Sequence, residues 1–202
     1  MYDMGDLKPD AVGLFGLASE QMGHFTAEQA RAYGMSKQLV AHHIATGRFI
    51  HVRRGLYRFR DYPSSPHDEV MAAWLAAGKE TAVVSHESAL VLLDLSDVVP
   101  HAVHLLIPRS RRGLVRPWGV ALHTTRYTLA PGDVVTREGM RVTAPLRTVL
   151  DVAETGTASE QVIMAVEQTK RRGWATDALP RERARSRGAR VAELIERGLQ
   201  VA

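Results

Sequence analysis

The chain has 202 residues, no cysteine and a formal net charge of +4 at pH 7. The lack of cysteine excludes disulfides, thiolate metal sites and cysteine nucleophiles. The longest strongly apolar run, residues 89–93, is far shorter than the roughly 20 residues of a membrane span. Residues 1–6 carry no base, unlike the start of a signal peptide. We therefore expect a soluble cytoplasmic protein with no membrane partner.

Basic residues are concentrated in three acid-poor blocks. Residues 31–60 hold seven bases and no acid, residues 98–132 hold five arginines and no acid, and residues 170–190 hold eight bases against two acids. Such blocks are typical of proteins that bind a polyanion, although solvated faces also produce them. Four arginines of the last block occupy every second position of the predicted helical tail, so they spread around the helix and form no single stripe. This spacing favours a solvated helix or contact with an acidic protein surface. They are Arg181, Arg183, Arg185 and Arg187.

The first part of the chain predicts three helices followed by a hairpin. Helical spacing covers residues 10–22, and His24-Phe25 breaks this helix. Thr26 and Gln29 form a capping-box pattern that opens a helix over 27–33, which ends at Gly34. Ser36 opens a third helix that runs to Thr46. Two β-like runs, 49–52 and 56–59, flank a basic turn. This order is that of a winged helix-turn-helix.

In such a motif the second helix of the pair enters the major groove, while the hairpin contacts phosphates or the minor groove. Leu39, Val40 and Ile44 form an inward stripe on this helix, so its other face is left for base edges. His43, beside the stripe, is expected to brace the helix. The candidate DNA-binding residues are Ser36, Lys37, Gln38, His42, Arg48, Arg53, Arg54 and Arg58. The alternative is a small helical domain that binds protein.

Residues 62–66 hold two prolines and two serines and predict a linker, which divides the chain into domains 1–62 and 63–202. The second domain alternates strands and helices, so we expect a mixed α/β fold (α+β) with a helical C-terminal end. Expected strands cover 81–84, 101–107, 120–124, 134–136 and 140–143. Four helices are expected to begin at a Ser65 cap, at a Ser85 cap, at Pro145 and at a Thr157/Glu160 capping box. A last helical tail is expected from residue 177, with interruptions at Gly188 and Gly198.

A turn after the second of these strands carries Arg109, Arg111 and Arg112. No element near them fits a groove, so we expect contacts with phosphate or with a partner.

Histidine spacing does not predict a metal site. His42 and His43 are adjacent on a helix and point about 100° apart. His101 and His104 face opposite sides of a predicted strand, and His123 stands alone. We expect neither metal nor cofactor.

No residue set predicts catalysis. Asp94 and Asp97 follow a helix without the Gly-Ser segment of a nucleotidyltransferase, and the predicted turn after Asp133 lacks a nuclease lysine. Residues 85–88, Ser-His-Glu-Ser, are explained by a helix cap and lack nucleophile-elbow glycines. There is no phosphate-binding glycine loop. We expect no enzyme activity and no catalytic residues.

Residues 24–59, HFTAEQARAYGMSKQLVAHHIATGRFIHVRRGLYRF, resemble the N-terminal domain of AbiEi-type antitoxins from type IV toxin–antitoxin systems. The likeness continues through residues 83–113 and 145–153, and so extends over about 25–198. This resemblance implies an operator-binding N-terminal domain and a larger C-terminal domain that counters a toxin. The toxins of this family are nucleotidyltransferase-like and are usually encoded next to the antitoxin.

We therefore expect a DNA-binding antitoxin that represses its own operon. The expected partners are double-stranded operator DNA with inverted repeats and a nucleotidyltransferase-like toxin. One alternative is a transcriptional regulator whose second domain senses a ligand or partner, with no toxin. The other is a nuclease-related enzyme, which is disfavoured because the chain ends at Ala202, soon after the last predicted helix.

Overall fold

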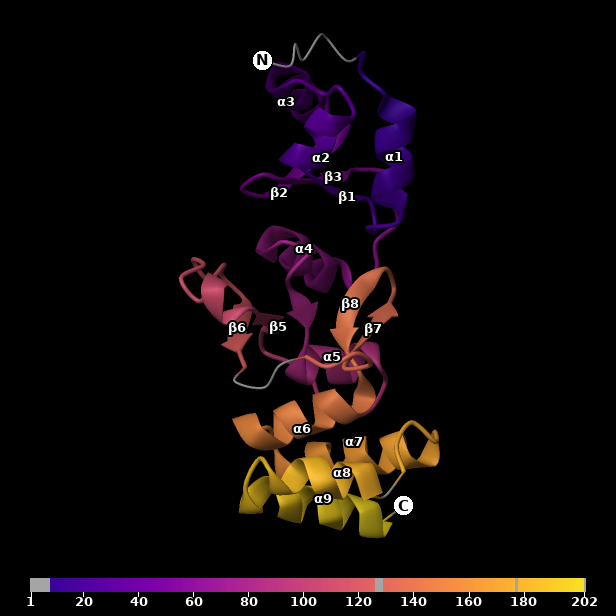
Figure 1. Ribbon diagram of the computed structural model, residues 1–202. Coiled ribbons are helices and arrows are strands. Elements are labelled where there is room, and N and C mark those ends of the chain that lie inside the picture. Colours follow the sequence, from indigo (N-terminus) through magenta and orange to yellow (C-terminus); the bar gives the residue numbers. More distant parts are fainter. Residues whose placement is uncertain (1–7, 126–128, 177, 202) are drawn as a thin grey trace. The chain divides into compact units, whose positions relative to one another are not determined.

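The computed structural model describes residues 8–125, 129–176 and 178–201 (Figure 1). The chain divides into two compact units, residues 1–79 and 80–202. The sequence instead places a domain boundary at residue 62, and a functional separation there stays a prediction. Arg126, one of the arginines of the second basic block, lies outside the described residues, as do residues 1–6.

The first unit contains the predicted helices and hairpin plus one short strand. Its helices are α1 (Ala11–Ser19), α2 (Ala27–Ala32), α3 (Lys37–Ala45) and α4 (Asp68–Ala77). Its strands are β1 (His24–Thr26), β2 (Phe49–Arg53) and β3 (Leu56–Phe59), in the antiparallel order β1-β3-β2. The first helix ends before His24-Phe25, and these residues form the strand β1, which pairs with β3 and was not predicted.

Aromatic packing holds this unit together. Phe25, Phe49 and Phe59 come from the three strands, and their ring centroids lie 4.9–5.3 Å apart. Leu14 and Ala18 of α1 complete the same core. Each strand therefore presents one large ring to the helices, and aromatic edge-to-face contacts of this kind add to the stabilisation from area burial.

The helix after the predicted linker begins later than expected. The sequence placed its cap at Ser65, but α4 begins at Asp68 with His67 as the N-cap. Ser65 instead accepts a hydrogen bond from the backbone N–H of His67, and its own N–H donates to the Asp68 carboxylate. These local bonds make a turn before the helix, and α4 then packs on the sheet of the first unit.

The second unit is built on a mixed five-stranded sheet. The strands are β4 (Val83–Val84), β5 (Val103–Ile107), β6 (Val120–Thr124), β7 (Val134–Arg137) and β8 (Met140–Thr143). Their order is β6-β5-β4-β8-β7. The pairs β5–β6 and β4–β8 are parallel, and β4–β5 and β7–β8 are antiparallel.

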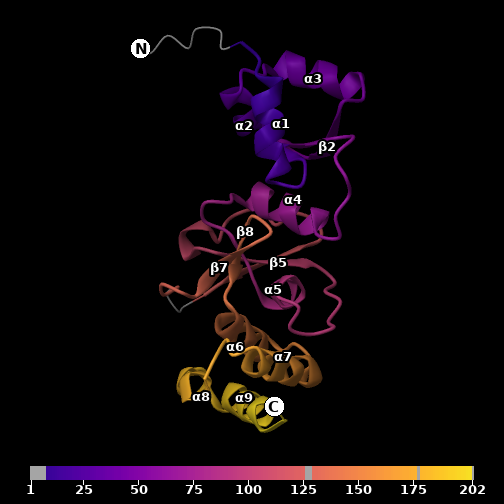
Figure 2. The ribbon, with the colours of Figure 1, turned by 90° about the vertical axis from the view of Figure 1, so that its right-hand side faces the viewer.

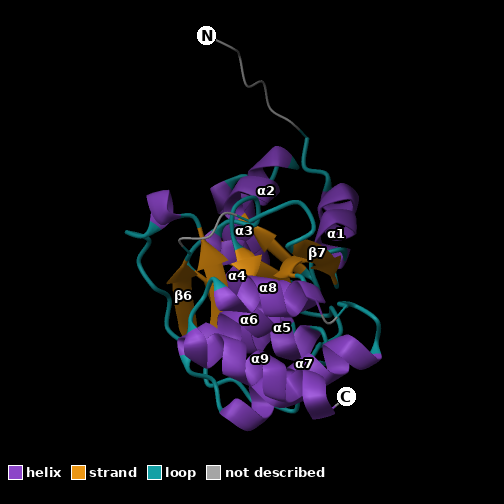
Figure 3. Cartoon of the chain, turned by 60° about the horizontal axis from the view of Figure 1, so that its bottom comes forward, coloured by secondary structure: helices purple, strands orange, loops and turns teal. Residues whose placement is uncertain are grey.

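Helices cover one side of this sheet in layers (Figures 2 and 3). The helices are α5 (His86–Leu92), α6 (Pro145–Thr155), α7 (Ser159–Arg171), α8 (Ala178–Arg185) and α9 (Ala189–Val201). Helix α5 packs on the sheet and against α6, and α6 in turn contacts α7, α8 and α9. The prediction of a mixed α/β chain with a helical C-terminal end is confirmed.

Two expected helix signals in this unit were wrong. Thr157 does not open a capping box, because α7 is capped at Ala158 and the Thr157 hydroxyl donates to Glu87 at 3.0 Å. Gly198 does not interrupt the tail but lies inside α9. A Cβ on Gly198 would stand 2.5 Å from Cβ of Val166, so this glycine allows α9 to approach α7 closely.

The basic tail also departs from expectation. Arg181 binds Glu196, Arg183 binds Asp133, and Arg187 is buried and binds Asp151. Three of the four arginines are therefore paired with carboxylates of the second unit, while Arg185 is exposed. None of the helices in the described ranges is long and apolar enough to cross a membrane.

Candidate nucleic-acid interface

Helix α3 begins and ends where its sequence dictates. The Ser36 hydroxyl accepts a hydrogen bond from the N–H of Leu39 at 3.1 Å, so this side chain is the N-cap. Helix α2, which precedes it, carries the complete capping box of Thr26 and Gln29 that the sequence predicts. Both helices of the pair are therefore fixed by local side-chain bonds to their first turns.

The two faces of α3 differ as the periodicity predicts. Val40 is buried, and Leu39 and Ile44 pack against the aromatic core. The opposite face is exposed and is formed by Lys37, Gln38, Ala41 and His42. A helix held in this way presents a lysine, an amide and an imidazole near its N-terminus, groups that can bind base edges or phosphate.

His43 lies between these faces. Its ring packs 4.8 Å from the ring of Phe49, which agrees with the expected bracing role. Burial, followed by the nearby charges of Arg48 and His42, lowers the pKa of His43. A neutral imidazole therefore braces α3 against β2.

The hairpin β2–β3 carries the other predicted contacts. A register irregularity lies between His51 and Arg53, next to the turn at Arg54-Gly55. Arg48 and Arg54 are exposed and Arg53 is half-buried. The turn therefore brings cationic side chains to the tip of a two-stranded projection.

Arg58 differs from the other candidates because it lies inside the unit. Its guanidinium donates to the carbonyl oxygens of Met22 and Pro63 and lies 3.2 Å from the Asp68 carboxylate. Because Arg58 contacts all three of these groups, it braces α4 against the sheet. We therefore leave Arg58 out of the proposed interface.

The arginine group of the second unit lies where the sequence places it, after β5. Arg109 and Arg111 belong to a 3₁₀ turn, η1 (Arg109–Arg111), and Arg112 follows it. Arg109 and Arg112 are exposed, while Arg111 donates to the hydroxyl of Thr81 at 2.8 Å.

Carboxylates that the sequence weighed for catalysis are engaged in ion pairs. Asp94 lies 3.0 Å from Arg172, and Asp133 is buried between Arg147 and Arg183.

The histidines group differently from expectation. His101 lies before β5, which begins at Val103, and His123 does not stand alone: His86, His104 and His123 meet in the second unit. The available signal in the sequence was one histidine in each of two apolar strands, His104 in VHLLI and His123 in VALHT. The sequence does not show that these histidines meet, because that depends on the register in which β5 pairs with β6.

Comparison with known proteins finds one family similar to the first unit. Residues 14–60 match the family model described as "Transcriptional regulator, AbiEi antitoxin". The match runs from α1 to just past β3 and confirms the resemblance over this part of the chain. No curated protein matches the chain.

The whole chain also resembles a solved structure, the crystal structure of RV2827C protein from Mycobacterium tuberculosis. The TM-score is 0.62 at 14% sequence identity, and the alignment covers 96% of this chain and 79% of that one. At this identity the likeness establishes a shared fold across both units.

Proposed function

We propose that this protein is a DNA-binding antitoxin that represses its own operon through a winged helix-turn-helix formed by α3 and the β2–β3 hairpin. The observation that carries the proposal is the exposed face of α3, formed by Lys37, Gln38 and His42 beside a hairpin with Arg53 and Arg54 at its tip. The surrounding block of residues 31–60 has no acid to repel phosphate. The family match over residues 14–60 supports regulation of transcription.

The second part of the proposal is that the second unit counters a nucleotidyltransferase-like toxin. It is supported by the resemblance of residues 83–113 and 145–153 to AbiEi-type antitoxins. Such a toxin would be encoded beside the antitoxin. A neighbouring reading frame for a nucleotidyltransferase-like protein therefore favours this proposal, and its absence favours a regulator without a toxin. A surface of this unit, which includes Arg109 and Arg112, is the proposed contact.

The DNA-binding proposal is tested by gel shifts across a salt series with the duplex upstream of the protein's own gene and a scrambled duplex. Replacing both Arg53 and Arg54 with Ala should lower the slope of log affinity against log salt by roughly 0.9 for each phosphate that these side chains neutralise. Gln38→Ala should cost about 1–3 kcal/mol on the upstream duplex if its amide binds a base in a bidentate way, and little on the scrambled one.

The matched control is Arg190→Ala, which removes an exposed arginine of α9 in the second unit and should leave both quantities unchanged. Wild-type binding by the Arg53/Arg54 variant, together with abolished binding when Arg109, Arg111 and Arg112 are replaced, would place the DNA site outside the first unit.

A further inference from the structure

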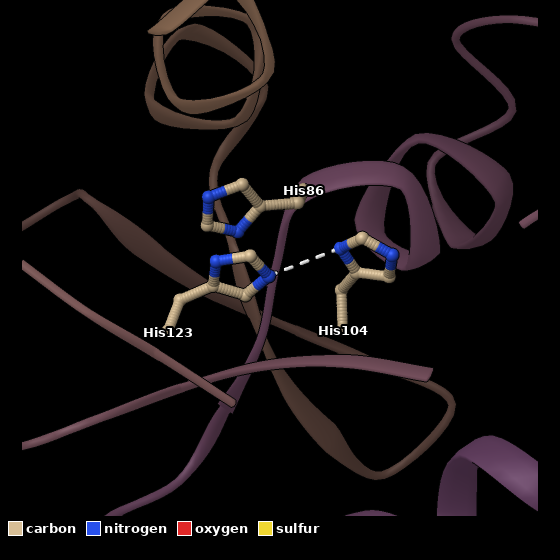
Figure 4. A group of neighbouring side chains, drawn as sticks. All are labelled: His86, His104 and His123. Atoms are coloured by element: carbon tan, nitrogen blue, oxygen red, sulfur yellow. Dashed lines mark hydrogen bonds between the residues drawn. The ribbon is translucent and has the colours of Figure 1, made fainter. Parts of the chain in front are cut away.

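Three histidines from three different elements converge in the second unit (Figure 4). His86 begins α5, His104 lies in β5 and His123 in β6. In the parallel register of β5 and β6, Leu106 pairs with His123, and His104 and Leu106 share one face of β5. Each histidine offers a ring nitrogen, and the three nitrogens all lie within 4.8 Å of one another. Nε2 of His123 is 3.1 Å from Nδ1 of His104.

Neighbouring side chains lie behind two of these rings. Oε2 of Glu87 lies 3.9 Å from Nε2 of His104, and the other Glu87 oxygen accepts a hydrogen bond from Thr157 at 3.0 Å. Oγ of Ser85 lies 2.9 Å from Nδ1 of His86. A carboxylate or hydroxyl behind an imidazole fixes the orientation of a histidine that ligates a metal. The nitrogens left for a ligand are then Nδ1 of His104 and Nε2 of His86.

Burial disfavours the charged form of these rings. It lowers the pKa of His86 to about 2 and, against the raising effect of the Asp151 and Glu87 carboxylates, that of His123 to about 4. Burial also lowers the pKa of His104. Neutral imidazoles offer lone pairs at pH 7, which protonated rings do not.

The backbone at His86 points to a site as well. Its φ is +52°, a left-handed conformation that a residue with a Cβ rarely adopts. Strain of this kind clusters at binding and catalytic sites. His86 and His123 also line a cavity of about 420 Å³, together with Asp151 and Arg109.

We propose that His86, His104 and His123 bind one divalent transition-metal ion of the zinc class, with a fourth coordination position open to this cavity. Imidazole nitrogens suit Zn²⁺, Cu²⁺ and Ni²⁺. Ligands at Zn–N distances of about 2.0–2.1 Å in a tetrahedron stand about 3.4 Å apart. The 3.1 Å between Nε2 of His123 and Nδ1 of His104 is close to this separation, so the inward movement is needed at His86, whose nitrogen lies within 4.8 Å of the other two.

That movement is a tilt of one ring. His86 stacks on His123 with centroids 3.7 Å apart and planes 19° from parallel. A metal lies in the plane of the imidazole that binds it, so the His86 ring tilts off this stack when the ion binds. The fourth position then takes water from the cavity, whose lining carries the Asp151 and Glu154 carboxylates as well as Arg109.

The test uses Co²⁺ as a spectroscopic probe on EDTA-treated full-length protein. We expect one equivalent of Co²⁺ per chain, with the visible d–d absorption of a four- or five-coordinate nitrogen site, and displacement by Zn²⁺. Replacing His86, His104 or His123 with Asn should weaken Co²⁺ binding by about 100-fold or more, and Glu87→Gln by about 10–100-fold. His101→Asn, an exposed histidine three residues before His104, is the matched control and should bind as wild type.

A second measurement covers the case in which a histidine variant does not fold. Zn²⁺ should raise the Tm of the wild-type chain, because an ion that joins α5, β5 and β6 binds only the folded state. Absence of the d–d bands, no rise in wild-type Tm, or wild-type affinity in the His123 variant overturns the proposal and leaves a hydrogen-bonded histidine cluster. Equal weakening by His101→Asn also overturns it.

Discussion

Arg147 lies in α6 with about 1% of its surface exposed, and its charge is balanced by carboxylates from within the second unit. Its Nε donates to both oxygens of Asp151 at 2.9 Å, and its Nη1 lies 3.5 Å from Asp133. Arg187 reaches the same Asp151 at 2.7 Å. Asp151 therefore pairs with two buried cations, which Asp133 and Glu154 also contact, and a buried cation without enough carboxylate charge is costly.

We predict that Asp151→Asn destabilises the second unit by about 3–5 kcal/mol, because the change keeps the shape of the side chain and leaves two buried guanidinium groups without its charge. Denaturant unfolding followed by circular dichroism measures this loss. The matched control is Arg171→Ala, which breaks an ion pair with Glu167 at the same four-residue spacing but with the arginine 62% exposed. A surface pair contributes about 0–1 kcal/mol, so comparable losses in the two variants would contradict the prediction.

His24 is a buried titratable group in the first unit. Burial lowers its pKa, against the raising effect of a hydrogen bond with the carbonyl of Gln21 at 3.2 Å. A group whose folded pKa is lowered stabilises the protein above its unfolded value of 6.5, and this stabilisation is lost as the pH falls from there towards the folded pKa. We predict that the stability difference between wild type and His24→Asn shrinks as pH falls from 7.5 to below 6. The other histidines are common to both chains and cancel, so a constant difference in urea unfolding would exclude the effect.

At the scale of elements, the sequence correctly predicts features that depend on side-chain contacts between residues close together in the chain. The caps of α2 and α3 depend on residues within four positions, and both were predicted correctly. The Thr157 cap failed because Glu87, 70 residues away, takes its hydroxyl. Strand β1 was missed because three residues carry too little pattern to reveal their pairing with β3.

The same division applies to the candidate site. The inward and outward faces of α3 follow from periodicity, and the hairpin follows from its turn. Arg58 was assigned to the interface because charge alone does not reveal its bond to Pro63 or its ion pair with Asp68 on α4. The histidine cluster needed the register of β5 on β6 and the position of α5, which single-sequence spacing does not contain.

Two glycines inside helices allow a test of helix packing. We predict that Gly198→Ala destabilises the second unit by about 1–3 kcal/mol, because its Cβ would lie 2.5 Å from Cβ of Val166 and force α9 from α7. Gly16→Ala in α1 meets nothing within 4 Å and should stabilise the chain by up to about 1 kcal/mol, the usual gain in a helix. Thermal unfolding compares them, and Val166→Ala should not rescue Gly198→Ala, because alanine keeps the Cβ that the new methyl group would meet. Stabilisation by both alanines would contradict the close approach.

At the scale of the whole molecule, the three basic blocks differ in what balances them. In the block over residues 170–190, at least five of the eight bases bind carboxylates of the second unit. Except for Glu167, four residues before Arg171, these acids lie outside the neighbouring turns of the chain, so the block is acid-poor mainly along the sequence. Exposed arginines also lie at the hairpin tip and at the turn after β5, where Arg54, Arg109 and Arg112 are exposed.

If the proposed antitoxin function is correct, these two surfaces should be separable in the full-length chain. We predict that replacing Arg53 and Arg54 with Ala relieves repression of a reporter under the protein's own promoter and preserves protection from the neighbouring toxin. Replacing Arg109, Arg111 and Arg112 with Ala should preserve repression and weaken protection, because loss of charge at a protein interface slows association with an acidic partner. Reporter expression and growth during toxin induction measure the two effects, with immunoblots to match protein levels. Loss of both functions in either variant would show that one surface serves both partners.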